Sequence, residues 1–155
     1  MSSKKSKYPN YGIVTEYASS IVGGKKIACR ELIDGCHRFF NDLDNPLYDF
    51  NPKDAEFVIG IIEKTFVHEK GEDMQGRPLR GRPFLLEPWQ KFVVYNLLGF
   101  FHKDTRLRKY KEAFIMLARK NGKTPFMSAL AWGLGLLERR SGAEIVIVGA
   151  LLKQA

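Results

Sequence analysis

Two short, continuous apolar runs constrain the fold of this chain more than any other feature. They cover residues 113–117 and 143–148, and between them, over residues 123–140, apolar side chains return at helical spacing. A continuous apolar run is typical of a strand that is covered on both faces in a parallel sheet. Strand, loop, helix and strand in this order predict a βαβ unit, and therefore an α/β fold.

The first hundred residues favour helices instead. A Ser/Lys-rich N-terminal tail is expected to be frayed, and apolar residues at helical spacing then predict a helix over residues 25–43. A second helix is expected to start with Asn51 as N-cap and Pro52 as its first residue, and to stop by Gly71. The N-terminal region is thus predicted to be mainly helical.

A loop and a third helix follow. Residues 71–83 (GEDMQGRPLRGRP) hold three glycines and two prolines, which interrupt regular structure. Pro88 is well placed to begin the next helix. We therefore divide the chain into residues 1–83, a helical leader with a basic tail and a Gly/Pro/Arg loop, and residues 84–155, which begin the α/β part.

Composition indicates one soluble domain with a core, because 45% of the 155 residues are hydrophobic and 27% are charged. The apolar runs are far shorter than the roughly 20 residues of a membrane span, and the basic start has no apolar segment behind it as a secretory signal would. A cytoplasmic location is expected. Cys29 and Cys36, seven residues apart on a helix, are expected to be reduced core thiols, and with His37 they do not have zinc-site spacing.

Positive charge is concentrated in one stretch of the chain. The formal net charge is +8, and residues 102–123 hold eight Lys and Arg but only two acids. Such a concentration favours an anionic partner, either nucleotide phosphate or nucleic acid, although a solvated surface has the same composition. The candidate nucleic-acid contacts are Arg106, Arg108, Lys109 and Lys111.

The sequence ARKNGKT, which follows the first apolar run, resembles a phosphate-binding loop. Its Gly122 allows close approach of the backbone, Lys123 supplies a charge for the β and γ phosphates, and the Thr124 hydroxyl is placed to bind Mg²⁺. The glycine that opens the standard pattern is replaced by Leu117. The ARKNGKT loop lies between a predicted strand and a predicted helix, which is the context that a nucleotide site requires.

A second feature lies about thirty residues upstream, in PFLLEPWQKF. Gln90 follows Trp89 in a helix that starts with proline, and such a pair can cover an adenine ring and read its edge. The alternative is that Trp89 belongs to the core and Gln90 is a surface amide.

Taken in order, several segments resemble the N-terminal part of the large terminase subunit, the ATP-driven DNA-packaging motor of tailed bacteriophages. LLEPWQKFVVYNLLGF is similar to the adenine-recognising segment of that family, ARKNGKT to its variant Walker A loop, and IVIVGALLKQA to its next strand and turn. GKKIACRELIDGCHRFFNDL also resembles the helical leader of these proteins. In this family an Arg-Lys pair commonly replaces glycine-rich sequence within the loop, as Arg119 and Lys120 do here.

The resemblance implies a P-loop ATPase with a RecA-like parallel sheet, of which the chain would hold an incomplete start. ATP and Mg²⁺ are the implied cofactors, and double-stranded DNA, the small terminase subunit and the portal protein are the implied partners. Arg119 would stabilise transition-state charge in cis. The implied nucleotide-binding residues are Trp89, Gln90, Arg119, Lys120, Asn121, Gly122, Lys123 and Thr124.

The acids that catalysis requires are missing from the sequence after Glu144. A P-loop ATPase needs a Walker B acid after a later strand, and the terminase family adds a carboxylate-rich nuclease domain. We therefore expect a truncated large subunit or a prophage remnant that binds ATP without turning it over, and whose unpaired apolar edges make it marginally stable. The alternatives are a small basic DNA-binding or adaptor module with an incidental Gly-Lys-Thr, and another P-loop enzyme.

Overall fold

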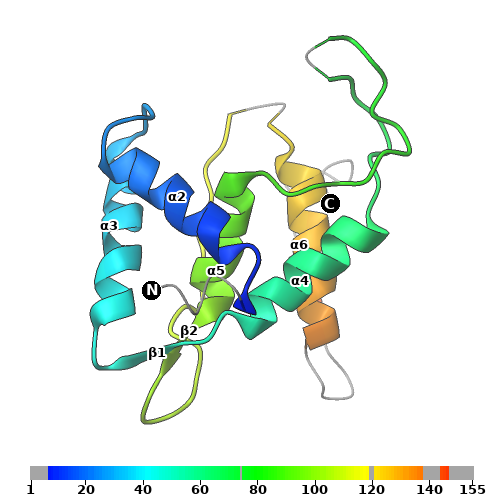
Figure 1. The fold of residues 1–155 in the computed structure, drawn as a ribbon. Helices are drawn as coiled ribbons and strands as arrows, with labels where there is room; N and C mark the ends of the chain where they lie inside the picture. The colour runs from blue at the N-terminus through cyan, green and yellow to red at the C-terminus, as the bar shows by residue number, and fades with distance from the viewer. Residues whose placement is uncertain (1–6, 74, 119–120, 138–143, 147–155) are drawn as a thin grey trace.

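In the part of the chain that the computed structural model describes, five helices are packed side by side, with α5 (Pro88–Gly99) at the centre (Figure 1). The structure describes residues 7–73, 75–118, 121–137 and 144–146. On one side α5 packs against α2 (Tyr11–Val22), which in turn packs against α3 (Arg30–Asp44). On the other side it packs against α4 (Lys53–Thr65), which contacts α6 (Lys123–Leu137).

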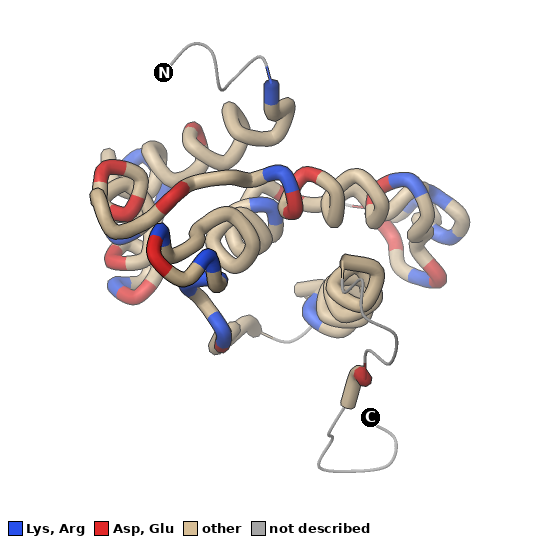
Figure 2. Tube along the Cα trace, turned by 90° about the horizontal axis from the view of Figure 1, so that it is seen from below, with Lys and Arg blue, Asp and Glu red and all other residues tan. Residues whose placement is uncertain are grey.

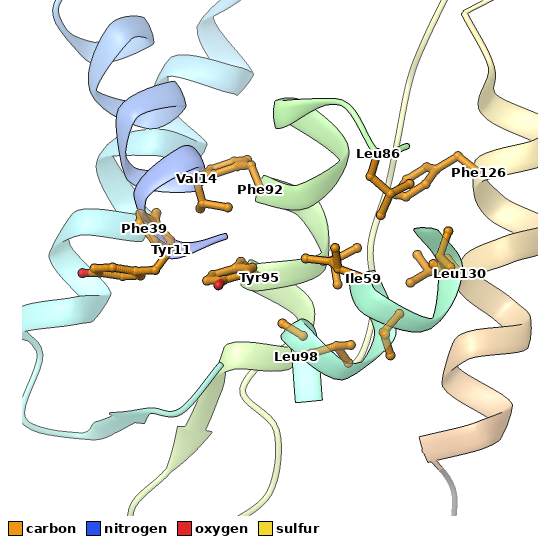
Figure 3. Packing of buried hydrophobic residues seen from close by; sticks show 14 of the residues in the cluster. Tyr11, Val14, Phe39, Ile59, Leu86, Phe92, Tyr95, Leu98, Phe126 and Leu130 are labelled. Atoms are coloured by element: carbon orange, nitrogen blue, oxygen red, sulfur yellow. The ribbon is translucent and has the colours of Figure 1, made fainter. Parts of the chain in front are cut away.

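The core runs through all five helices because α5 is buried on more than one face. Its Phe92 and Tyr95 lie among residues of α2 and α3, including Tyr11 and Phe39, in the close view (Figure 3). Rings of Phe39 and Phe92 meet edge to face at 5.5 Å, a favoured aromatic geometry. A helix at the centre of a layered bundle needs apolar residues on two sides, which explains why α5 shows little amphipathic patterning.

One helix was missing from the sequence prediction. The N-terminal segment was expected to be a frayed tail, but Tyr11–Val22 form α2 and bury Tyr11, Val14, Ala18 and Ile21. These residues are three, four and three positions apart, which is the spacing of one helical face. The helical spacing of apolar residues was therefore visible in the sequence, although the basic residues before it do not show this spacing.

The other helices agree with their predicted positions within a few residues. Helix α3 begins at Arg30 rather than at residue 25, and α5 begins at Pro88 as predicted. Helix α4 begins at Lys53 with Pro52 at its N-cap, so the predicted start, with Asn51 as N-cap and Pro52 as the first helical residue, is one residue too early. The Asn51 carboxamide oxygen still accepts a hydrogen bond from the Lys53 backbone N–H at 3.3 Å. Both cysteines are free thiols, but only Cys36 is buried, and the prediction that Cys29 lies in the core was wrong.

The α/β class is confirmed in coarse form only, since the sheet found in the described residues is small and antiparallel. Strand β1 (Tyr48–Phe50) pairs with β2 (Phe100–His102), with Asp49 opposite Phe101. Residues 113–117, expected to be a buried parallel strand, form no strand. Phe114 is 88% and Met116 79% exposed. A short apolar run becomes a buried strand only where neighbouring strands cover its edges, and the described residues supply none there.

Half of the second predicted strand, residues 143–148, lies outside the described residues. Its described part, residues 144–146, forms no strand. The parallel sheet therefore remains a prediction.

Candidate functional site

The predicted phosphate-binding loop leads directly into α6. Gly122 has a φ of +68°, in the left-handed region that favours glycine, and no atom lies within 4 Å of the position a Cβ would take. Glycine is thus favoured here by the positive φ and not by a lack of room for a side chain. The Phe126 N–H donates to the Gly122 carbonyl at 3.1 Å, so the helical hydrogen bonds begin at this residue.

Helix α6 therefore opens at Lys123, as the motif requires. The N–H groups of a first helical turn have no acceptor within the helix, and they carry the positive end of its dipole. Pro125 removes one of these N–H groups without breaking a helical bond. Asn121, Lys123 and Thr124 are exposed to solvent at this end of the helix.

A cavity of about 530 Å³ lies beside the start of α6. One wall comes from α6 and the residue before it, and the other comes from the segment between α4 and α5. The lining residues are Phe66, Val67, His68, Glu69, Lys70, Phe84, Gly122, Lys123, Thr124, Pro125 and Ser128. Volumes of roughly 300–1,000 Å³ are typical of small-molecule sites.

The second wall is the base of a projecting arm, which we define as residues 66–84 (Figure 1). Backbone hydrogen bonds hold its two sides together, from Phe84 N to Phe66 O and from His68 N to Arg82 O, both at 2.9 Å. The sequence predicted an irregular loop over residues 71–83, and this is confirmed because the described residues of the arm, 66–73 and 75–84, form isolated bridges but no strand or helix.

The arm tip is organised around one carboxylate. Asp73 accepts hydrogen bonds from the backbone and the guanidinium of Arg77, and its side chain also lies 3.5 Å from Arg82. The backbone N–H of Arg77 is the largest cause of a lowered pKa at Asp73. Two of the three arginines in this loop therefore face an acid of the same loop.

Trp89 and Gln90 lie at the start of α5, and neither is among the described residues that line the cavity. The ring of Trp89 meets that of Phe126 at 5.4 Å, joining α5 to α6. The Gln90 carboxamide oxygen accepts a hydrogen bond from the Glu87 backbone N–H at 2.8 Å, and Gln90 is only 4% exposed. Together with the Glu87 side chain it forms a capping box.

Arg119 and Lys120, the remaining predicted nucleotide contacts, lie outside the described residues. No three His, Cys, Asp or Glu side chains in the described ranges gather as a metal site. For Mg²⁺, the predicted protein contact is the hydroxyl of Thr124, a residue that lines the cavity.

Three of the four predicted nucleic-acid contacts lie against carboxylates. Arg106 lies 3.2 Å from Asp49, and Arg108 lies 3.7 Å from Asp54. Figure 2 shows acidic and basic segments interspersed along the described chain, while α6 carries charge only at its first residue. Lys111 is exposed. The local excess of positive charge in the sequence is therefore partly neutralised by acids from distant positions.

Lys109 is the most enclosed of these cations. Its ammonium forms an ion pair with the buried Asp42 and lies 4.0 Å from the centre of the Tyr48 ring. Burial, the largest single influence, lowers the pKa of Lys109, but its hydrogen bonds with Asp42 and Tyr110 outweigh burial and the net shift is upward. Lys109 thus joins the segment after β2 to α3, which is a structural role.

The arm side of the cavity was missed by sequence reasoning. Residues 66–70 contain no motif, and their approach to α6 depends on the packing of α4 against α6. A hint was available in Val67 and Phe84, apolar residues at the two ends of a segment rich in glycine, proline and charge.

Comparisons of the chain with protein-family models, curated proteins and solved structures found no match. Within the described ranges, no helix has both the length and the apolar character needed to cross a membrane.

Proposed function

We propose that this chain is the ATP-binding portion of a bacteriophage terminase large subunit, the motor that packages double-stranded DNA into a prohead. The ordered resemblance of its segments to that family supports the proposal. The structural observation that carries it is the cavity of about 530 Å³ beside Gly122, Lys123 and Thr124. The loop that resembles a Walker A motif thus borders a space of suitable size for a nucleotide.

The residues at the start of α6 have the chemistry to hold a triphosphate. Amides of a first helical turn attract anions, and the Lys123 ammonium adds a full positive charge beside them. The Thr124 hydroxyl suits a Mg²⁺ ion that is itself bound by phosphate oxygens. When bound, Mg²⁺ would neutralise phosphate charge.

The finer assignments belong to the same proposal. They include a RecA-like parallel sheet, in which residues 113–117 would be the strand before the loop. Arg119 would act in cis on transition-state charge, and the exposed Lys111 is the proposed cation for DNA contact. The small terminase subunit and the portal protein are the proposed protein partners.

The proposal is tested by calorimetric titration of the 155-residue chain with ATP and Mg²⁺. Lys123→Ala should weaken ATP binding by at least about tenfold, the loss expected for a charged hydrogen bond to phosphate. Lys103→Ala, an exposed lysine outside the cavity, is the matched control and should leave ATP affinity unchanged.

The same variants separate this function from that of a small basic DNA-binding module. Duplex DNA is titrated at several salt concentrations, because each lost phosphate contact lowers the salt dependence by about one unit of slope. If Lys123→Ala lowers DNA affinity and its salt slope while the chain binds no ATP, the Gly-Lys-Thr sequence is incidental and the motor assignment is wrong.

A further inference from the structure

The two walls of the cavity differ in chemistry. The α6 wall supplies backbone amides, an ammonium and hydroxyl groups through Gly122, Lys123, Thr124 and Ser128. The wall formed by the arm supplies aliphatic and aromatic side chains, including Val67, as well as the polar residues 68–70. A nucleoside triphosphate has the same division between a charged end and a flat, weakly polar end.

We propose that the base of the arm holds the nucleobase of the nucleotide whose phosphates bind at the start of α6. This inference rests on the proposed function and adds the location of the base. Val67 and the imidazole of His68 provide the contact surface, and Phe84 supports it from behind.

The arm wall is ordered by contacts that do not involve a ligand. The rings of His68 and Phe84 meet edge to face, with centroids 5.0 Å apart, and Phe84 is buried. The ring of Phe66 meets that of Trp132 in α6 at 5.3 Å, which ties the arm base to the helix that carries the phosphate wall. Both walls are thus held in one arrangement before binding, which lowers the entropic cost of binding.

Val67 is available for such a contact because it is 53% exposed although it is aliphatic and adjoins the cavity. Covering an aliphatic side chain with a base removes apolar surface from water and favours binding. An imidazole edge or face can also pack against an aromatic base.

The alternative position for the base is the start of α5, where the resemblance places Gln90. In the structure the Gln90 oxygen is occupied by the Glu87 N–H, and the Trp89 ring packs against Phe126. Gln90 is only 4% exposed, so an adenine contact there would require the side chain to be uncovered. The geometry therefore points to the arm.

The test uses two probes on the 155-residue chain in the presence of Mg²⁺: ATP, and inorganic tripolyphosphate, which has the phosphates but no base. Val67→Ser removes aliphatic surface without adding charge, and it should weaken ATP binding by about tenfold and leave tripolyphosphate binding unchanged. Leu85→Ser is the matched control, since Leu85 is 64% exposed but does not line the cavity. It should change neither affinity.

Failure of this inference can be distinguished from failure of the proposed function. Lys123→Ala should weaken the binding of both ATP and tripolyphosphate, because phosphate binding does not depend on the base. If Lys123→Ala does so while Val67→Ser behaves like Leu85→Ser, the nucleotide site stands and the base position is wrong. The inference is also overturned if Gln90→Ala selectively weakens ATP while Val67→Ser does not. If the wild-type chain binds neither probe, both proposals fall.

Discussion

The ammonium nitrogen of Lys91 lies 3.0 Å from Oε1 of Glu63, in the contact between α5 and α4. The same ammonium donates to the Asn10 carboxamide oxygen at 2.9 Å, and the same Glu63 oxygen accepts from the Leu86 backbone N–H at 3.0 Å. Asn10 also donates to Glu56, whose carboxylate accepts a short hydrogen bond from the Tyr95 hydroxyl. One polar network thus joins the start of α2 to α4 and α5.

Replacing Lys91 should therefore weaken the fold. The Lys91 side chain is 10% exposed, so Lys91→Met keeps its packing but leaves the Glu63 carboxylate without a cation. We expect a loss of about 2–3 kcal/mol in the free energy of unfolding, measured by urea denaturation. The control is Lys64→Met, at an exposed lysine next to Glu63 on α4. It should lower the free energy of unfolding by less than about 0.5 kcal/mol. Equal losses in the two variants would show that the network contributes little.

Alkaline pH should destabilise the protein through Cys36. Burial raises the pKa of this thiol from 9.0 to about 11. Because the folded state holds the proton more tightly than the unfolded state, the contribution of the thiol is complete below pH 9 and is lost as pH rises toward 11. Tyrosines whose pKa is raised from 10.0 by burial also lose stability as pH approaches 10, so the share of the cysteine is the part of the slope that removing its thiol abolishes.

The measurement is the slope of unfolding free energy against pH in that range. Cys36→Ala should flatten the slope, whatever its effect on stability at neutral pH. The control is Cys29→Ala, which removes an exposed thiol and should leave the slope as it is in the wild type. A slope in Cys36→Ala equal to that of the wild type would assign the pH dependence to other groups.

Gly133 should be required where α6 crosses α4. A Cβ at this position would lie 2.8 Å from Cγ1 of Val58, which is fully buried. Gly133→Ala should therefore destabilise the protein by about 1–3 kcal/mol, despite the better helix propensity of alanine. Gly60→Ala in α4, where nothing lies within 4 Å of the added Cβ, should stabilise it by about 0.5–1 kcal/mol.

A double variant checks the cause. In Val58→Ala combined with Gly133→Ala the clash is absent, so the combined loss should be smaller than the sum of the two single losses. If the two single losses in the free energy of unfolding, measured by heat or urea, add up to the loss in the double variant, the clash is not the cause of the destabilisation.

The exposed apolar residues before the loop should limit solubility. Phe114 and Met116 are among the most exposed large hydrophobic residues, and Ile115 between them packs against the core. Replacing both Phe114 and Met116 with Ser should raise the soluble fraction and change the free energy of unfolding by less than about 0.5 kcal/mol. Ile115→Ser should instead lower stability. Sedimentation and urea unfolding of the three proteins separate these outcomes, and a cooperative melt of the wild-type chain above about 50 °C would contradict marginal stability.

The sequence alone determined the local features of this protein. Pro88 at the start of α5, the irregular segment over residues 71–83 and glycine at position 122 all depend on neighbours within a few residues. Such features follow from the stereochemistry of proline and glycine and from short side-chain to backbone hydrogen bonds. The resemblance of ARKNGKT to a phosphate-binding loop is local in the same sense.

Only the tertiary structure decided which distant residues meet. It placed the base of the arm opposite Lys123, gave Arg106 and Arg108 acidic neighbours, and used Gln90 to cap its own helix. It also left Phe114 exposed, although the pattern around it is that of a buried strand. Whether an apolar or charged residue finds a partner depends on the packing of helices far apart in the chain, and periodicity within a segment carries no information about that packing.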